Sequence, residues 1–476
     1  MDRNPSSMPA RWARALRPWL TLALIAVVGI LFPKLLAAGP VAFGMAGADT
    51  QIIGGTLKLV YEDFIAEQTN NKFPLKDLFK WTDVEFAGQE IVYDAHVQRN
   101  VSPMFCGEDG AFADAGAQQS IKVHIGQKKL MARVRLTSEA IHDSMKSEGA
   151  FKAARKDEMT RIIDDIARME EYALSSDGRG VLSLIDVTIS GAVVNVDAPG
   201  GIVGDDFGNR FFLPGMYVAA VDPATGAMRT SIRKVVSCAS AGDQVTFDSS
   251  TFTGWADNDY LVQAANSSVT DILDTSYEHG FWGMTALFDD GTYRNNYFNV
   301  DRSQWQQYQS YVKASTGALS LDLFQQVADV VDQKLGGSID LMTAHHSVRR
   351  LYLSLLEADR RYSGNNLMKP DGGTTAFTQG DITMGEVPIK AIRTHPLASM
   401  FLLDTKNSGF VCYGSEKGKW VDEDGSVLVR VGIGTTARDS FEAWYRKRQQ
   451  YHVRYPGKNA RLDGITGQSL IVVRDF

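Results

Sequence analysis

The sequence predicts an α+β fold, and three patterns along the chain support this prediction. Residues 86–136 alternate apolar and polar side chains with a period of two, which is typical of long strands with one covered face. Residues 150–174 keep apolar side chains on one face of a helix. Residues 186–268 consist of short β-like runs between turn signals. With 476 residues, the chain is long enough for two or three domains.

The composition is that of an ordinary globular protein, with 44% hydrophobic and 22% charged residues. A net charge of -7 argues against a nucleic-acid binder with a basic face, because phosphate contacts require clustered lysines and arginines. Basic clusters such as residues 445–448 are short, so any contact with DNA is expected to be weak. Cys106, Cys238 and Cys412 lie far apart, which excludes a disulfide framework, shows no metal-ligand spacing and fits a reducing compartment.

The N-terminus has the features of a leader. Arg11, Arg14 and Arg17 precede the apolar run WLTLALIAVVGILF, which is short for a spanning helix and resembles a secretory signal peptide. An upstream in-frame extension that ends before Met45 is the alternative. In both cases we expect residues 1–44 to be absent from the mature protein.

Residues 45–85 predict an extended N-terminal arm, and residues 86–136 predict an extended β-hairpin loop. The arm ends in a short apolar contact formed by Pro74, Leu75, Leu78 and Phe79. The tip of the hairpin, residues 101–119, reads VSPMFCGEDGAFADAGAQQ and offers little beyond two phenylalanines and a methionine for burial. Two strands alone are marginal in water, so the hairpin must lie on something else, with another copy of the chain as one candidate.

Residues 137–180 predict a long helix that ends at the SSDGRG turn. The helix itself, from about residue 150 to residue 174, would be roughly 37 Å long at 1.5 Å per residue, with charged residues on the face opposite its apolar stripe. Residues 181–395 predict an α/β domain that carries the β-rich segment 186–268 as an inserted small barrel or sandwich. In the α/β part, Ser320 can cap a helix that ends at Gly336, and a second helical stripe, 348–356, follows.

Residues 396–476 predict a hairpin-rich return of the chain. Its strongest hairpin signal is Asp424-Gly425, between two segments that read as strands. The GIGTTA motif at residues 432–437 matches the loose form of a dinucleotide-binding loop, but its strand belongs to a hairpin and not to a βαβ unit. A bulged strand end explains the motif better.

The sequence shows no catalytic, cofactor-binding or metal-binding set. His345 and His346 point to different sides and lack a carboxylate or cysteine at ligand spacing, so a capping or surface role explains them. For Cys106, a small buried contact is a simpler interpretation than a reactive thiol. The aromatic residues within 305–311 fit a core or an interface better than a stacking platform for bases. We therefore predict no enzyme activity and no cofactor.

The order of these parts resembles the major capsid proteins of tailed bacteriophages, which have the Hong Kong 97 type of fold. ARMEEYALSSDGRGVL resembles the end of that family's spine helix, and NNYFNVDRSQWQQYQ resembles the segment that follows. GALSLDLFQQVADVVDQKLGGSIDLMTAHHSVRRLYLSLL resembles the helices and strand of the axial domain, and DGSVLVRVGIGTTARDSFEAWYRKRQQYHVRYPGKNARLDGI resembles the C-terminal return. The resemblance covers about residues 45–476, except for the insertion near 186–268.

This resemblance implies a peripheral domain with a spine helix at 137–180, an axial domain at 181–395, and a return through both at 396–476. It also implies self-assembly into hexamers and pentamers of an icosahedral shell that encloses double-stranded DNA. In this family the extended loop lies across the neighbouring subunit. The tip residues expected to make the intersubunit contact are Met104, Phe105, Cys106 and Phe112. Glycine and alanine suit such a tip because they let the backbone approach a neighbour closely.

Some members of the family join subunits through a loop lysine, but Lys122, Lys128 and Lys129 lie toward the base of the hairpin, so we expect no crosslink. The resemblance further implies portal and scaffolding proteins as partners, packaged DNA that is contacted weakly and non-specifically, and no membrane in the mature form. Location in the virion, after assembly in the host cytoplasm, follows from the same resemblance.

Two alternatives remain open. An encapsulin-like compartment shell would have the same fold, although the insertion and the long N-terminal segment favour the phage form. A secreted or membrane-anchored β-rich binding protein or hydrolase would account for the leader. It would leave the spine helix, the unsupported hairpin and the missing catalytic set unexplained.

Overall fold

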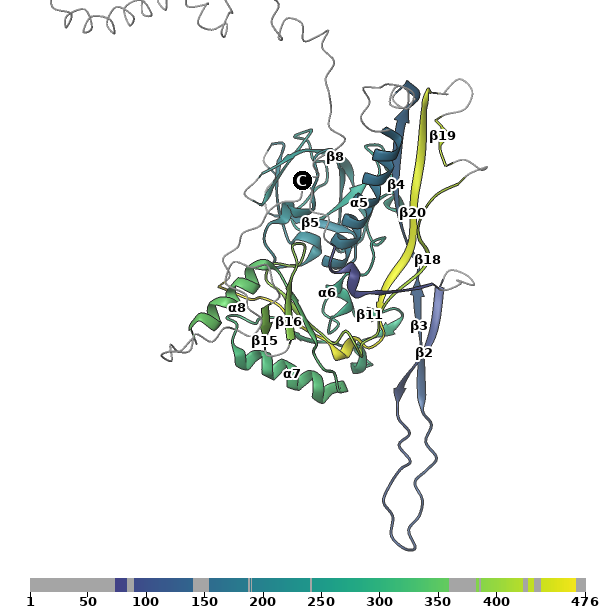
Figure 1. Cartoon of the computed structure of the whole chain (residues 1–476), viewed down its shortest axis with the longest axis vertical. Coiled ribbons are helices and arrows are strands. Elements are labelled where there is room, and N and C mark those ends of the chain that lie inside the picture. The colour runs from purple at the N-terminus through teal and green to yellow at the C-terminus, as the bar shows by residue number, and fades with distance from the viewer. Residues whose placement is uncertain are drawn as a thin grey trace, which may run out of the picture. The chain divides into compact units, whose positions relative to one another are not determined.

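The structure of the chain is a computed structural model (Figure 1). The residues that it describes are 73–83, 90–139, 154–186, 189, 191–239, 242–358, 382–384, 387–422, 427–431 and 438–467. The predicted leader, most of the N-terminal arm, the Asp424-Gly425 turn and the GIGTTA motif lie outside them. All elements below belong to the unit formed by residues 64–476. Within the described ranges, no helix combines the length and the apolar character needed to cross a membrane.

A five-stranded sheet forms the first layer of the fold. Its strands are β1 (Lys80–Asp83), β4 (Lys128–Thr137), β18 (Phe410–Trp420), β19 (Val429–Arg430) and β20 (Ser440–Val453). β20 pairs with β4 along one edge and with β18 and β19 along the other, and β1 adds to β18 in parallel. Helix α5 (Ala154–Ser175) packs against this sheet, as Figure 1 shows. It is the long helix that the sequence predicts.

This pairing corrects two expectations. The hairpin loop predicted over residues 86–136 ends at Gly126, because the last strand of that range, β4, pairs with β20 in the sheet. The two segments around Asp424-Gly425 were expected to pair with each other. Instead, β18 and β19 both pair with β20, because the longer strand offers a continuous edge to both.

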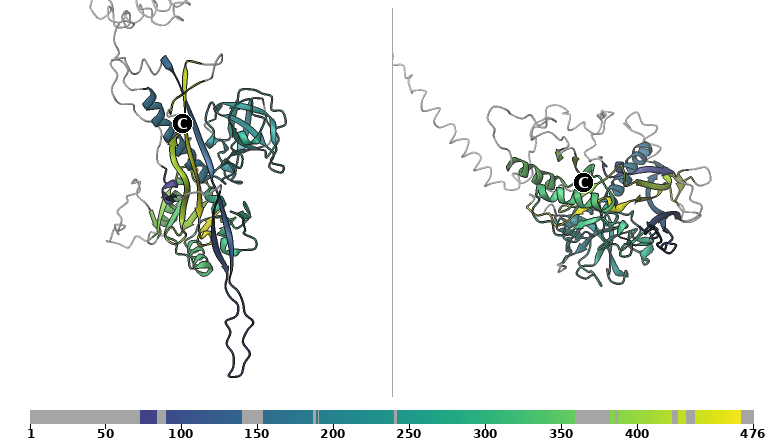
Figure 2. Two further views of the ribbon diagram at one scale, coloured as in Figure 1. Left: turned by 90° about the vertical axis from the view of Figure 1, so that its right-hand side faces the viewer. Right: turned by 90° about the horizontal axis from the view of Figure 1, so that it is seen from below.

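The hairpin itself consists of β2 (Glu90–Gln98) and β3 (Gln119–Gly126), paired antiparallel. Its base is packed on its own chain, since Val123 and Ile125 are fully buried in the central core. The Tyr93 hydroxyl lies 2.8 Å from Nε2 of His452, and the backbone N–H of His124 donates to the carbonyl of Phe298 at 3.0 Å. The expectation that the hairpin must lie on something else is therefore confirmed for its base, which packs on the body of its own chain. Only the tip extends beyond the core (Figure 2).

A closed six-stranded barrel follows α5. Its strands are β5 (Val181–Ile185), β6 (Val193–Asp197), β7 (Tyr217–Val221), β8 (Met228–Cys238), β9 (Gln244–Phe247) and β10 (Tyr260–Ala264). The module begins five residues before the predicted 186, because β5 is its first strand. β5 and β10 close the barrel, and Val181 is a direct partner of Val262, so the two ends of the module lie side by side. Tyr172 of α5 packs into the barrel core.

Because the two ends of the barrel module lie side by side, we expect that the barrel can be removed without unfolding the rest of the chain. Replacing residues 181–264 with a short Gly-Ser linker should preserve α5 and the later helices, because the main core is contributed by other segments. A loss of a few kcal/mol in the free energy of unfolding is expected, since Asp205 and Arg210 no longer bind the segment 393–398. Circular dichroism and urea denaturation measure both quantities. Complete loss of the helical signal would show that the barrel strands belong to the main core.

The second layer is an α/β domain with a six-stranded sheet in the order β13-β21-β17-β14-β16-β15. The strands are β13 (Tyr311–Lys313), β14 (Leu341–Ala344), β15 (Ile382–Met384), β16 (Val387–Ala391), β17 (Met400–Leu403) and β21 (Ala460–Leu462). Helices α7 (Leu321–Leu335) and α8 (His346–Ala358) pack on it. The Ser320 hydroxyl accepts the backbone N–H of Leu323, and Gly336 ends α7 with a φ of 64°, which confirms both predicted caps.

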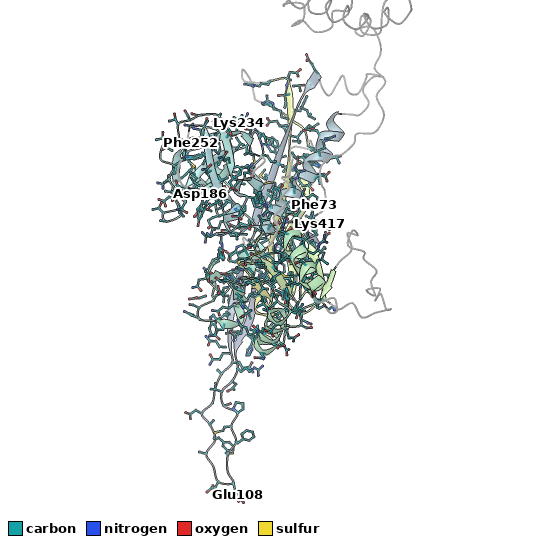
Figure 3. The ribbon with its side chains drawn as sticks, turned by 90° about the vertical axis from the view of Figure 1, so that its left-hand side faces the viewer. Phe73, Glu108, Asp186, Lys234, Phe252 and Lys417 are labelled. Carbon is teal, nitrogen blue, oxygen red and sulfur yellow. The ribbon has the colours of Figure 1, made fainter. Side chains whose placement is uncertain are left out.

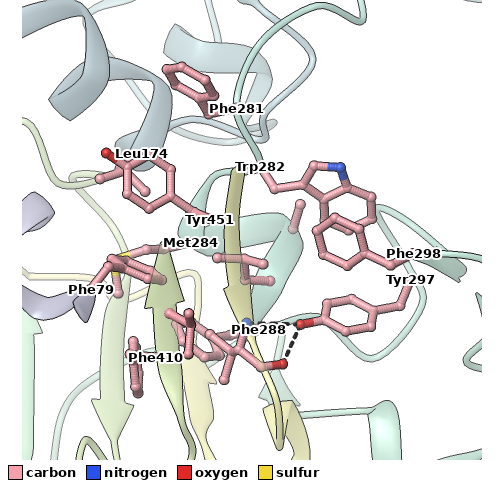
Figure 4. Close-up of a cluster of buried hydrophobic side chains, with 14 of the residues drawn as sticks. Phe79, Leu174, Phe281, Trp282, Met284, Phe288, Tyr297, Phe298, Phe410 and Tyr451 are labelled. Atoms are coloured by element: carbon pink, nitrogen blue, oxygen red, sulfur yellow. Dashed lines mark hydrogen bonds between the residues drawn. The ribbon is translucent and has the colours of Figure 1, made fainter. Parts of the chain in front are cut away.

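The central core joins the sheet, the hairpin base and the α/β domain (Figure 4). Its aromatic side chains come from distant segments, and include Phe79, Phe288, Tyr297, Phe410 and Tyr451. The Tyr297 hydroxyl donates to the carbonyl of Val453 at 2.6 Å, so this polar group is satisfied inside the core. Short elements in this region are α6 (Met284–Leu287), β11 (Asn296–Tyr297), β12 (Val300–Asp301) and the 3-10 turns Lys76–Leu78 and Gln306–Tyr308.

Candidate intersubunit surfaces

The tip of the hairpin exposes apolar side chains. Residues 99–118 join β2 to β3 without regular structure, and Figure 3 shows Glu108 at the far end. Phe105 and Phe112 are 105% and 91% exposed. Burying such a ring is worth about 1.5–3 kcal/mol, so two exposed rings on one loop make the tip a candidate contact surface.

Local contacts shape this tip. The backbone N–H of Ser102 donates to Oδ1 of Asn100 at 2.9 Å, and that of Gly110 donates to the carbonyl of Gly107 at 3.1 Å. A Cβ at Gly116 would meet the side-chain oxygen of Asn100, so the two legs of the tip approach each other closely at this glycine.

The four tip residues singled out from sequence all lie on this loop, and all are exposed. Met104, Phe105 and Phe112 therefore remain available for an intersubunit contact, which stays a prediction. For Cys106, the expectation of a small buried contact is wrong within the chain, because the tip contains no core that could cover the thiol.

The five-stranded sheet carries a second surface, which sequence reasoning missed. Cross-strand pairing matches Lys129 with Arg448, Met131 with Arg446, Arg133 with Trp444 and Arg135 with Glu442 on one face of β4 and β20. On the same face, β18 pairs Lys419 with Arg446 and Glu416 with Arg448. We call this set of ten side chains the basic face. The opposite face of the sheet is covered, since Val134 and Ala443 are buried and Lys447 reaches Glu170 of α5 at 2.8 Å.

The basic face has six cations and two carboxylates. Glu416 receives a bidentate hydrogen bond from Arg446, at 2.7 and 2.8 Å, and Lys419 lies 3.2 Å away. The Arg446 guanidinium holds the pKa of Glu416 below its usual value. Glu442 lies 3.7 Å from Arg133 and 3.8 Å from Arg135. Arg133 and Lys419 keep 64% and 60% of their side chains exposed, so the face presents a surplus of positive charge to its surroundings.

The cations of the basic face are separated in the sequence, which explains why the chain was expected to lack a basic face. They come from three strands, and only the pairing of β4, β18 and β20 brings them together. The available signal was their period of two, at 129, 133 and 135 and again at 446 and 448, because this spacing places side chains on one face of a strand.

A buried acidic pair on the covered side attaches the N-terminal segment to α5. Glu170 accepts hydrogen bonds from Lys447 and Gln449, both at 2.8 Å, and lies 3.1 Å from Nζ of Lys76. Glu171 accepts the backbone N–H groups of Leu75 and Lys76 at 3.0 and 3.2 Å. Burial raises the pKa of Glu171 to about 7, although these two N–H groups oppose the shift. The predicted contact of this segment is thereby confirmed for Leu75 and Phe79, which are buried.

The raised pKa of Glu171 predicts a dependence of stability on pH. Because the folded state binds the proton more tightly than the unfolded state, this group favours folding at low pH, and the contribution is lost as pH rises from about 4.5 to about 7. From pH 5 to pH 8, the free energy of unfolding should therefore fall by about 1–3 kcal/mol more in the unmodified protein than in Glu171→Gln. Urea denaturation at several pH values measures this, with Glu108→Gln on the exposed tip as control. Parallel curves for Glu171→Gln and the unmodified protein would contradict the prediction.

The remaining sequence candidates have structural roles. His345 is buried, and its Nδ1 accepts the backbone N–H of Ser347 at 3.3 Å, which confirms a capping role at the start of α8. Tyr308 is buried in the central core, and Trp305 packs against it, which confirms the core interpretation. Lys128 donates from Nζ to the carbonyl of Glu278 at 2.7 Å. Among the residues that the structure describes, no group of three or more histidine, cysteine or acidic residues could hold a metal ion.

Comparison with solved structures identifies the fold. A chain of the cyanophage A-1(L) capsid superposes with a TM-score of 0.53 at 9% identity, over 88% of this chain and 99% of that chain. The protein therefore has the fold of tailed-phage major capsid proteins, the Hong Kong 97 type. The capsid of a native GTA particle gives a TM-score of 0.47 at 11% identity, over 89% and 100% of the two chains. The holo-SrpI encapsulin complex from Synechococcus elongatus gives 0.41 at 12% identity, over 90% and 99%. No protein-family model and no curated protein sequence matches the chain.

Proposed function

We propose that the chain is a major capsid protein, a structural subunit that self-assembles into hexamers and pentamers of an icosahedral shell around double-stranded DNA. The observation that carries the proposal is the hairpin tip, where Phe105 and Phe112 lie beyond the core of their own chain. A self-assembling subunit supplies the partner that these rings require. The capsid fold supports the same function.

The proposal assigns a separate structural role to each part of the chain. Residues 45–85 form the N-terminal arm, the hairpin binds a neighbour, and α5 is the spine of a peripheral domain beside the axial α/β domain. The protein is located in the virion and is assembled in the host cytoplasm, with portal and scaffolding proteins as partners and no membrane. It has no catalytic role and no covalent crosslink through Lys122, Lys128 or Lys129.

Electron microscopy of the purified protein tests this function. The chain is expressed both in full and from Met45, and closed shells with hexamers and pentamers are the expected result. Nucleic acid inside particles recovered from infected cells supports a virus capsid, whereas a protein cargo would identify an encapsulin-like compartment. A protein that stays monomeric in both forms would contradict a shell function and favour a secreted binding protein or hydrolase.

A further inference from the structure

We propose that His452 and Tyr93 form an acid-sensitive lock, which holds the base of the hairpin on the body of its own chain and releases it when His452 takes up a proton. Both partners belong to one chain, so the lock does not depend on the shell function. Because the tip continues from this base, the lock also sets the direction in which the tip leaves the body (Figure 2).

Polar contacts attach the hairpin base to the body. The backbone N–H of His124 donates to a backbone carbonyl of the body at 3.0 Å, and the side-chain amide of Gln307 donates to the carbonyl of Val97 at 2.9 Å. Amides do not titrate. The Tyr93 hydroxyl lies 2.8 Å from Nε2 of His452, and an imidazole is a group that changes its charge in the acid range. This contact is therefore where a proton can act on the attachment.

The hydrogen bonds around His452 determine which ring nitrogen carries a proton. The Tyr297 hydroxyl donates to the carbonyl of Val453 at 2.6 Å, so its oxygen acts as an acceptor toward Nδ1 of His452, at 3.4 Å. This network assigns the proton of the neutral ring to Nδ1, and Nε2 then accepts the Tyr93 hydroxyl. A second proton goes to Nε2, which then no longer accepts, so the contact with Tyr93 is lost in its present form.

A positive charge on His452 is costly in this position. The ring is fully buried, and the centroids of the aromatic rings around it lie 5.0–6.1 Å from its own, in Tyr93, Tyr297, Phe298 and Tyr413. The charged side chain that acts on it is Arg454, a second cation, which donates to the Tyr413 hydroxyl at 3.0 Å. Burial, followed by the charge of Arg454, lowers the pKa of His452 to about 3. Burial raises the pKa values of Tyr93 and Tyr297, so both hydroxyls stay neutral and supply no counter-charge.

The chain has a hinge for this release. β3 belongs to the hairpin and ends at Gly126, whereas β4 belongs to the five-stranded sheet and begins at Lys128, so one residue, Gln127, separates them. Lifting the base takes Tyr93 away from His452 and lets water reach the ring, which restores its ordinary pKa of 6.5. Since the locked state binds the proton more weakly than the released state, the lock is at full strength above about pH 6.5 and weakens as pH falls toward 3.

Thiol labelling of the full-length, unassembled subunit measures the release. Val123 on β3 is fully buried against the body, so in Val123→Cys the new thiol becomes reactive when the base lifts. The reagent is 4,4′-dithiodipyridine, peptide mass spectrometry separates the sites, and the exposed Cys106 corrects for thiol reactivity at each pH. The rate at position 123 relative to Cys106 should be about 25-fold higher at pH 5 than at pH 7, because the pKa of His452 is about 3 in the locked state and 6.5 in the released state. Ile125→Cys, at another fully buried position of β3, gives the same measurement if Val123→Cys does not fold.

Two further variants and one native cysteine control the measurement. His452→Gln keeps a donor and an acceptor but removes the titration, so the rise with acid should disappear. His124→Gln, at the histidine that pairs with Glu90 inside the hairpin, is the matched control and should retain the rise. Cys412 reports on opening of the whole chain. It is buried and follows Val411, the cross-strand partner of His452, so its side chain lies on the opposite face of the sheet and should stay protected.

A relative rate at position 123 that does not change between pH 7 and pH 5 overturns the lock, as does an equal rise in the presence of His452→Gln. A parallel rise at Cys412 would show that the whole chain opens, which also overturns a lock confined to the hairpin. All rates are measured on subunits, so a failure of the shell function would leave them unchanged.

Discussion

Replacing residues 99–118 with Asn-Gly is expected to give a folded subunit that no longer forms closed shells. Gln98 and Gln119 are direct cross-strand partners, so a two-residue turn can join β2 to β3 without changing their register. The hairpin base should stay in place because Val97, Val123 and Ile125 are buried in the central core. No side chain of the lost segment is buried, so the free energy of unfolding should change little.

Sedimentation measures the loss of shells, and urea denaturation of the unassembled subunit measures its stability. Phe105→Ala with Phe112→Ala keeps the length of the loop and should weaken assembly through the lost ring contacts alone. Leu273→Ala, at another highly exposed apolar position, is the control and should assemble normally. Shells of ordinary stability from the shortened protein would show that the tip has no intersubunit role.

The elements that could be predicted from sequence are those whose signals are local. The helix α7 is defined by Ser320 before it, an apolar stripe within it and Gly336 after it, and all three signals lie within about five turns of helix. The barrel was predicted as a β-rich module for the same reason. Its first strand was missed because every residue of VLSLI is buried, so the strand lacks the alternation that marks a half-exposed strand.

Long-range pairing could not be predicted in this way. β4 has the alternating pattern of a hairpin strand, and nothing near it in the sequence shows that its partner is β20, about 300 residues later. The same pairing creates the basic face, whose arginines appear in the sequence as separate short clusters. The position of the tip could be predicted because a small-residue loop between two strands is a local feature, and the exposure of its side chains follows from the absence of any core nearby.

Substitution of Arg302 by methionine is expected to cause one of the largest losses of stability in the chain. Its guanidinium is fully buried and donates to the carbonyls of Ala286, Leu287, Arg294 and Tyr308 at 2.8–3.0 Å. Asp289 lies 3.6 Å away, and the ring of Tyr297 lies 4.6 Å from the guanidinium carbon. Burial lowers the pKa of Arg302 to about 10, so the side chain still carries its charge at neutral pH. One side chain thus joins three separate segments around the central core.

Methionine has similar bulk but no donor, so four carbonyls lose a partner. Asp289 loses the cation at 3.6 Å but keeps Arg461, at 3.3 Å, and the backbone N–H groups of Gly291, Tyr293 and Arg294. Removing one partner from a buried charged network costs about 3–5 kcal/mol, a large share of the 5–15 kcal/mol that typically stabilises a domain. Urea denaturation of the unassembled subunit should show a loss of this size for Arg302→Met, and a smaller loss for Arg302→Lys, which retains the charge without the planar fork. Arg133→Met, on the exposed sheet face, is the control and should change stability by about 0.5 kcal/mol or less. A loss below about 1 kcal/mol for Arg302→Met would mean that the four carbonyls find other donors, and that Arg302 is not what joins these segments.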